Sequence, residues 1–142
     1  MDVFKTLISI AIIVLLFGVM VYVVAIQVRE YYQQTDPMLK IIKDTLSPLH
    51  EKVKDLQFFQ GDKSYTINKK KIYLCLKDEN EEYYDFNMLL YVAIHELSHV
   101  MCDEIGHTPK FNQIFHDNLI LAENLGIYDS TKPIITNYCG HT

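Results

Sequence analysis

The sequence is poor in positive charge, and nothing in it marks a division into several domains. Its one arginine is Arg29, and residues 31–142 hold 11 lysines against 16 aspartates and glutamates, which supplies the whole formal net charge of −5. A nucleic-acid surface needs clustered positive charge, so we expect no nucleic-acid partner. Internal repeats, low-complexity tracts and Gly/Ser linkers are absent, and 142 residues suffice for one domain of ordinary size.

Cysteine is also scarce. Cys75, Cys102 and Cys139 are widely spaced and odd in number. They form neither a C-x-x-C metal motif nor a disulfide framework, so they favour reduced thiols in a reducing compartment. We expect Cys102, one helical turn from a histidine on an apolar helix, to serve packing.

A long apolar run stands near the N-terminus. From Thr6 to Val28 there are 23 residues without a formal charge, most of them Ile, Val and Leu. As a helix this run spans about 34 Å, enough to cross a hydrocarbon core of about 30 Å. We interpret residues 1–30 as a transmembrane anchor that meets the lipid bilayer through residues 6–28. A cleaved signal peptide is the alternative, although its apolar region is usually only about 7–15 residues long.

Basic residues flank this run unequally. Lys5 and the terminal amine precede it, and Arg29, Lys40 and Lys43 follow it. The positive-inside rule counts these bases, so it favours a C-terminal domain on the cytoplasmic side by a margin of one charge.

The first half of residues 31–142 mixes helical and extended patterns. Apolar residues between positions 38 and 56 recur at helical spacing, and Pro48 interrupts them. A run at Ile134–Thr136 near the C-terminus is strand-like, and Asn68–Lys70 reads as a turn. Three earlier runs rich in β-branched and aromatic residues predict strands, at Leu56–Gln60, Ser64–Asn68 and Lys71–Lys77.

The second half is helical. A helical pattern extends from its cap at Asp85 to about Glu104 and breaks at Gly106. A second helix is predicted to begin at Pro109 and to end before Gly126. The fold class is therefore α+β, in which an N-terminal transmembrane helix precedes a small domain with a short three- to four-stranded sheet and two to three helices.

The first predicted helix of this half contains the pattern H-E-x-x-H, formed by His95, Glu96 and His99. Histidines four residues apart lie on one helix face, so both imidazoles can bind one tetrahedral Zn²⁺. Glu96 projects to the side, where it can reach a water on the metal and act as general acid/base. His107, after the helix break, is the candidate third ligand and leaves a fourth position for water. Glu123 on the next helix is an alternative third ligand.

Two segments carry a family resemblance. The stretch His95–His99 followed by Gly106–Phe111 (GHTPKF) resembles the WLM/SprT-like zinc metallopeptidases, whose pattern is H-E-L-x-H, a short loop, a third His and a Phe that opens a helix. The resemblance covers roughly residues 57–128. It implies a zincin-like domain with Zn²⁺ on the three histidines and Glu96 as general acid/base. The chain looks most similar to small membrane-anchored versions encoded by large DNA viruses. This similarity implies a viral protein, and the virion membrane is one location that it could occupy.

The chain departs from the family pattern at one spacing. Seven residues separate His99 from His107, where the family spacing is five, and a half-turn more of helix would absorb the difference. The family's DNA-binding segments and ubiquitin-like-modifier binding motifs have no counterpart in this short acidic chain. Its DNA–protein crosslink substrates are therefore not carried over.

Three hypotheses of function follow from these patterns. The first is a single-pass membrane zinc metallopeptidase that hydrolyses peptide bonds of a peptide or protein substrate near the bilayer. The second is a membrane-anchored structural or assembly protein, of a virion for example, that retains a zincin-like fold without turnover and assembles with other membrane or capsid proteins. Zinc would then stabilise the fold. The third is an adaptor without a metal, whose histidines share a helix by chance.

Overall fold

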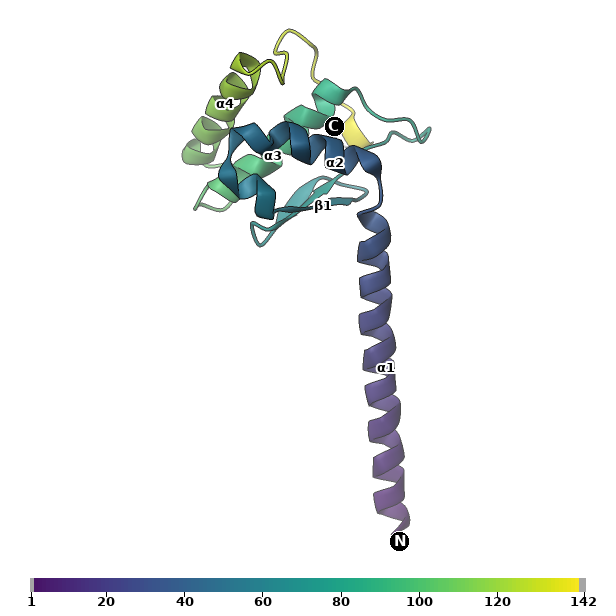
Figure 1. Cartoon of the computed structure of the whole chain (residues 1–142). Helices are drawn as coiled ribbons and strands as arrows, with labels where there is room; N and C mark the ends of the chain where they lie inside the picture. The colour runs from purple at the N-terminus through teal and green to yellow at the C-terminus, as the bar shows by residue number, and fades with distance from the viewer. Residues whose placement is uncertain (1, 141–142) are drawn as a thin grey trace. The chain divides into compact units, whose positions relative to one another are not determined.

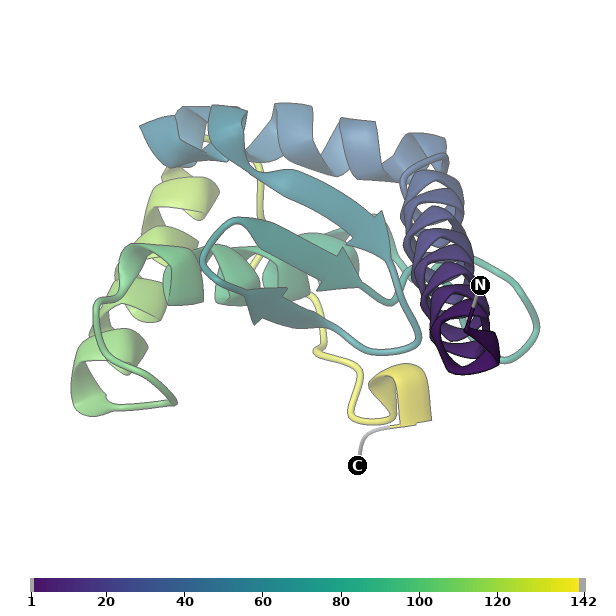
Figure 2. The same cartoon turned by 90° about the horizontal axis from the view of Figure 1, so that it is seen from below.

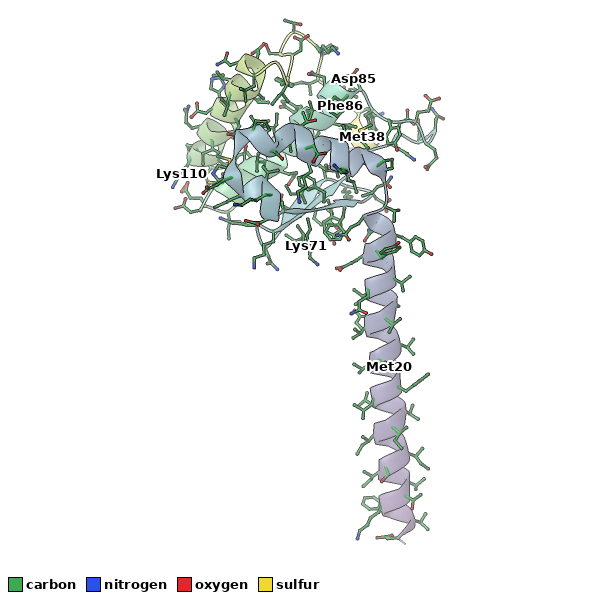
Figure 3. The ribbon with its side chains drawn as sticks, in the orientation of Figure 1. Met20, Met38, Lys71, Asp85, Phe86 and Lys110 are labelled. Atoms are coloured by element: carbon green, nitrogen blue, oxygen red, sulfur yellow. A yellow bond between two sulfur atoms is a disulfide. The ribbon has the colours of Figure 1, made fainter. Side chains whose placement is uncertain are left out.

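The computed structural model describes residues 2–140 and separates them into two units after Gln33 (Figure 1). The first unit is one helix, α1 (Val3–Gln33), whose 31 residues are about 46 Å long. None of its residues is buried, and its most apolar window has a mean hydropathy of 3.0. The side chains of α1, Met20 among them, project around the helix (Figure 3). α1 is thus long and apolar enough to cross a membrane.

The second unit begins at Gln34 and is an α+β domain, as predicted. Its elements follow in chain order: α2 (Pro37–Leu46), the 3-10 helices η1 (Ser47–Leu49) and η2 (Glu51–Asp55), the strands β1 (Gln57–Gln60), β2 (Tyr65–Ile67) and β3 (Lys71–Leu74), the helices α3 (Phe86–Met101) and α4 (Pro109–Asn124), and the short 3-10 turn η3 (Tyr138–Gly140).

The three strands form one sheet in the order β1-β3-β2, in which β3 is parallel to β1 and antiparallel to β2. Phe58, Ile72 and Thr66 share a register and face α3, which covers this side of the sheet (Figure 2). The opposite side carries a stack of Phe59, Tyr73 and Tyr65, whose neighbouring ring centroids lie 4.7 Å apart. β2 lies at the edge of the sheet beside α3.

Capping residues and a proline mark where the helices of this unit begin. Asp36 caps α2 by accepting a hydrogen bond from the Met38 backbone N–H at 2.9 Å, and α2 runs beside β1 (Figure 2). At Pro48 the chain changes from α to 3-10 geometry, which confirms the predicted interruption. Asp85 caps α3 as expected, and both Asp85 and Phe86 are labelled at the start of α3 in Figure 3.

Helices α3 and α4 are joined by a buried polar contact. The Asn118 side chain on α4 donates to Ser98 Oγ on α3 at 3.0 Å, and Ser98 donates in turn to the Ile94 carbonyl at 2.7 Å. Both side chains are buried, so the pair fixes the register between the two helices without leaving a polar group unsatisfied. This register matters because both helices contribute to the site below.

Two predictions about the C-terminal part are wrong. Ile134–Thr136 has no strand pairing, because the Ile135 N–H donates to Met88 Sδ of α3 at 3.4 Å instead of joining the sheet. Cys75, just after β3, and Cys139 in the tail (residues 129–140) form a disulfide, so the expectation of reduced thiols fails for these two. They lie 64 residues apart, and only the tertiary fold brings them together. Cys102 is free and buried, as expected.

Candidate metal centre

The structure brings the three predicted ligand histidines together. The ring centroids of His95 and His99 are 5.0 Å apart, and those of His107 lie 5.0 Å from His95 and 5.1 Å from His99. His95 Nε2 and His107 Nε2 are separated by 3.1 Å. One ligand nitrogen from each ring lies within 4.8 Å of the others. The pair from α3 and the third ring from the following loop therefore converge on one point.

A loop, not an extension of helix, carries His107 back to the helix. α3 ends at Met101, three residues before the predicted end, so the two additional residues in the spacing lie in the loop. Gly106 has φ of +85°, a backbone conformation that residues with a Cβ rarely adopt. Ion pairing of Lys110 with Asp103, at 2.6 Å, ties the start of the loop to the first turn of α4, where Figure 3 labels Lys110.

Two aromatic rings of α4 pack against the histidines. Phe111, almost fully buried on the first turn of α4, stacks on His99 with ring centroids 4.1 Å apart. The same ring lies 5.0 Å from His95 and 5.1 Å from His107, and Phe115 lies 5.0 Å from His95. These contacts restrict the three imidazoles before any ion binds, so little side-chain freedom remains to be lost.

The chemistry of the three rings fits a zinc ion. Burial and the nearby His99 and His107 lower the pKa of His95 to about 4, and burial also lowers the pKa of His99. Both imidazoles are therefore neutral near pH 7 and keep a nitrogen lone pair for a metal. A tetrahedral Zn²⁺ with Zn–N bonds of about 2.0–2.1 Å holds its ligand nitrogens about 3.3 Å apart, close to the 3.1 Å observed between His95 and His107.

Glu96 lies beside the histidines with its carboxylate on the sheet side of α3. Thr66 of β2 donates its hydroxyl to Glu96 Oε2 at 2.6 Å, and Glu96 is 5% exposed. Burial raises the pKa of Glu96, and the hydrogen bond from Thr66 opposes that rise. The carboxylate is thus a stronger base than an exposed glutamate, and it is fixed in position.

Thr66 was missed by sequence reasoning. Thr66 belongs to no recognised sequence motif, and the run at Ser64–Asn68 predicts only a strand. One signal was present: in a strand of alternating faces, Thr66 is the polar residue between Tyr65 and Ile67, which both face the other side. A polar side chain on the face that packs against a helix needs a partner there, and Glu96 is that partner.

Two hollows meet at these residues. The larger, about 550 Å³, extends over β2, the hairpin turn and the His107 loop, and includes Lys69 and Ile105. The smaller, about 290 Å³, lies between α3 and the tail. The two hollows share Ser64, His95 and Glu96, so they are adjacent, and all three candidate ligands line the larger one.

The remaining candidates lie elsewhere. Glu123, weighed as an alternative third ligand, is an exposed residue near the end of α4 and accepts a hydrogen bond from Ser130 Oγ at 2.5 Å. Among the described residues, the cluster of ligand atoms that could hold a metal consists of the three histidines. Lys69 lies exposed in the predicted turn between β2 and β3, and its side chain donates a hydrogen bond to the carbonyl of Cys102, the residue after α3.

Comparisons with known proteins identify viral relatives without an assigned activity. Uncharacterized protein 136R of Invertebrate iridescent virus 6 is 51% identical over 88 residues, which cover 60% of this chain and 49% of that protein. Uncharacterized protein 042R of Invertebrate iridescent virus 3 is 45% identical over 86 residues, 60% of this chain and 54% of that protein. Uncharacterized protein R325 of Acanthamoeba polyphaga mimivirus is 32% identical over 120 residues, 78% of this chain and 61% of that protein.

The chain spans about half of the first two relatives and three fifths of the third. No family model matches the sequence, and no solved structure matches the fold. The chain is therefore similar to viral proteins, and its activity has to be argued from the geometry of the site.

Proposed function

We propose that this chain is a membrane-anchored, zinc-dependent metallopeptidase. The observation that carries the proposal is the convergence of three imidazoles, from a helix and its following loop, beside a buried and hydrogen-bonded glutamate. Three nitrogen ligands with a base next to them leave room for water, which is the arrangement of catalytic rather than structural zinc. The resemblance of the motif to WLM/SprT-like peptidases agrees with this assignment.

The residues divide the work of peptide hydrolysis between them. Bound zinc would supply a Lewis acid that lowers the pKa of a coordinated water to about 7 and polarises the substrate carbonyl. His95, His99 and His107 would hold the ion. Glu96 takes the proton of the attacking water and later delivers it to the leaving amine. The Thr66 hydroxyl holds Oε2 of that carboxylate, so Oε1 is the oxygen that we assign to the transferred proton.

The sheet edge supports binding of an extended peptide. In the described part of the chain β2 pairs with β3 alone, and it borders the larger hollow through Tyr65 and Thr66. An extended substrate can pair with such an edge through its backbone, which places its carbonyls along the site without selecting a sequence. The peptide bond that passes Glu96 is then the one to be cut.

The deciding experiment is Glu96→Gln in the full chain, with zinc content and peptide hydrolysis measured on the same preparation. We expect about one zinc per chain in both proteins and a 10²- to 10⁴-fold loss of hydrolysis in the variant, the usual contribution of a general base. Glu51→Gln on η2, an exposed glutamate that lines neither hollow, is the matched control and should keep full activity. Turnover by Glu96→Gln at the parent rate would refute the assignment.

We infer the location of the activity from α1 and the disulfide. We propose that α1 is a single membrane span and that the three residues from Gln34 to Asp36 tether the compact unit to it. The basic residues favour a cytoplasmic domain by only one charge, whereas the Cys75–Cys139 disulfide favours an oxidising compartment. We give the disulfide the greater weight and place the compact unit on the oxidising side.

Protection from protease in sealed membranes tests this sidedness. A compact unit on the oxidising side should resist protease added to the cytoplasmic face until detergent opens the membrane. Digestion before detergent would instead place it on the cytoplasmic side.

A further inference from the structure

The smaller hollow beside the candidate centre is apolar over most of its lining. Met88, Tyr91 and Val92 of α3 form one wall, and Ile134 and Ile135 of the tail form the other. Three of its polar residues, Ser64, His95 and Glu96, also line the larger hollow and mark where the two join; the other two, Thr136 and Tyr138, belong to the tail. An apolar compartment of about 290 Å³ therefore opens directly on the residues assigned to catalysis.

The tail wall is fixed at both ends although it has no strand pairing. At its start, Asn87 of α3 donates to the Asp129 carbonyl at 3.0 Å and accepts from the Asp129 N–H at 2.9 Å. At its end, the Cys75–Cys139 disulfide and a hydrogen bond of 2.8 Å between Tyr138 and Ser64 attach it to the sheet region. A segment held in this way keeps a defined shape, so the hollow is built and not an accident of a loose loop.

We propose that this hollow is a specificity pocket that receives a large apolar side chain of the substrate, next to the bond that is cut, with Ile134 and Ile135 as the selecting wall. The proposal deepens the peptidase function and rests on it. A leucine, methionine or phenylalanine side chain fits the volume and loses its contact with water on entry. An acidic side chain would be desolvated beside the Glu96 carboxylate and is therefore rejected.

The larger hollow differs in its charged residues and in its exposure, although most of its lining surface is apolar as well. Lys69 and Glu104 carry charge at its rim, and its Ile105 side chain is 94% exposed, so a side chain placed there stays in contact with water. It suits the backbone and solvent-facing side chains of a bound peptide. The selection of a side chain by burial thus falls to the compartment between α3 and the tail.

The test uses three peptide hydroxamates that differ in one side chain: isobutyl, methyl and carboxymethyl. Their affinities are measured by calorimetry on the zinc-loaded full chain in detergent, so the readout is independent of turnover. We expect the isobutyl compound to bind at least about tenfold more tightly than the methyl compound, since each buried methylene changes discrimination by about 10-fold or more. The carboxymethyl compound should bind most weakly.

Two variants of the wall and one control connect this preference to the hollow. Ile135→Ala should reduce the isobutyl-to-methyl ratio severalfold, and Ile135→Phe, which narrows the hollow, should move the preference toward the methyl compound. Ile120→Ala on α4 is the matched control, because Ile120 is similarly exposed and does not line the hollow. It should leave the ratio unchanged. Zinc content and circular dichroism verify that each variant is folded.

The outcomes separate this proposal from the peptidase function. Hydroxamates that bind without discrimination, or not at all, overturn the specificity pocket, as does a ratio that is the same in both Ile135 variants and the parent. Discrimination by the hydroxamates with no hydrolysis of any peptide would support the pocket and refute the peptidase. Hydrolysis of peptides regardless of their apolar side chains would do the reverse.

Discussion

The two sides of the candidate site are held by different means. On the histidine side, consecutive elements fix the geometry: α3, a seven-residue spacing and the first turn of α4, with Phe111 stacked on His99. On the tail side, the contacts join residues far apart in the sequence, such as Cys75 with Cys139 and Ser64 with Tyr138. The contacts of the first side are local in sequence and those of the second are long-range. A substitution on one side should therefore leave the geometry of the other side unchanged.

Removing the disulfide should have the largest effect on stability and little effect on the metal. The double variant Cys75→Ser, Cys139→Ser opens a loop of 64 residues, which is expected to lower the free energy of unfolding by about 4 kcal/mol. Denaturant unfolding of the full chain in detergent measures the loss. Zinc affinity, measured at denaturant concentrations below the unfolding transition, should stay within about twofold of the parent, because the three candidate ligand histidines lie on α3 and the loop after it and not on the tail. A large loss of zinc affinity would show that the two sides are coupled.

Removing His107 should weaken zinc binding strongly and leave the stability of the fold almost unchanged. His107→Ala deletes one of three ligands from an exposed position, so we expect zinc to bind at least about 100-fold more weakly, more than the loss of a supporting residue usually costs. The fold should survive, because the ring contributes little burial. Competition with a chromophoric chelator gives the affinity, and His116→Ala, an exposed histidine on α4, is the control.

Removal of zinc with a chelator tests whether the histidine side keeps its structure without the metal. If zinc is catalytic, the metal-free chain should stay folded by circular dichroism and lose its activity; an assembly protein stapled by zinc should unfold instead. The packed Phe111 and the buried Ser98–Asn118 pair, which hold α3 to α4 without an ion, favour the first result.

The same division between local and long-range explains how much the sequence predicted. Helical periodicity and caps gave α3 and α4, and the i, i+4 spacing placed His95 and His99 on one face. These signals lie within a few residues of one another. The disulfide and the course of the tail depend on the position in space of Cys75, just after β3, relative to Cys139, which follows 64 residues later in the sequence. A local sequence pattern does not encode that spatial relation. The apolar run at Ile134–Thr136 has strand propensity, but it packs on Met88 of α3 and forms no ladder.

Thr66 is a residue of the site that the long-range fold supplies, and its removal should have an intermediate effect. Thr66→Val keeps the shape and deletes the hydrogen bond to Glu96 Oε2, so the base loses its fixed orientation. We expect a loss of about tenfold in kcat, since misplacing a catalytic group costs a fraction of its contribution. Thr66→Ser should restore most of the rate because it keeps the hydroxyl. Equal rates for the valine and serine variants would assign Thr66 a packing role only.

Gly106→Ala should have the smallest effect and tests the local side alone. A Cβ at φ of +85° strains the backbone by about 1 kcal/mol, although nothing within 4 Å would clash with it. The loop can relieve that strain only by changing the path that returns His107 to α3. We therefore expect zinc affinity to fall severalfold while the unfolding free energy falls by about 1 kcal/mol. Gly126→Ala, at φ of +73° after α4, carries the same strain and should lower stability without changing zinc affinity, because no ligand follows it. Equal zinc affinities in the two variants would mean that the turn at Gly106 does not position His107.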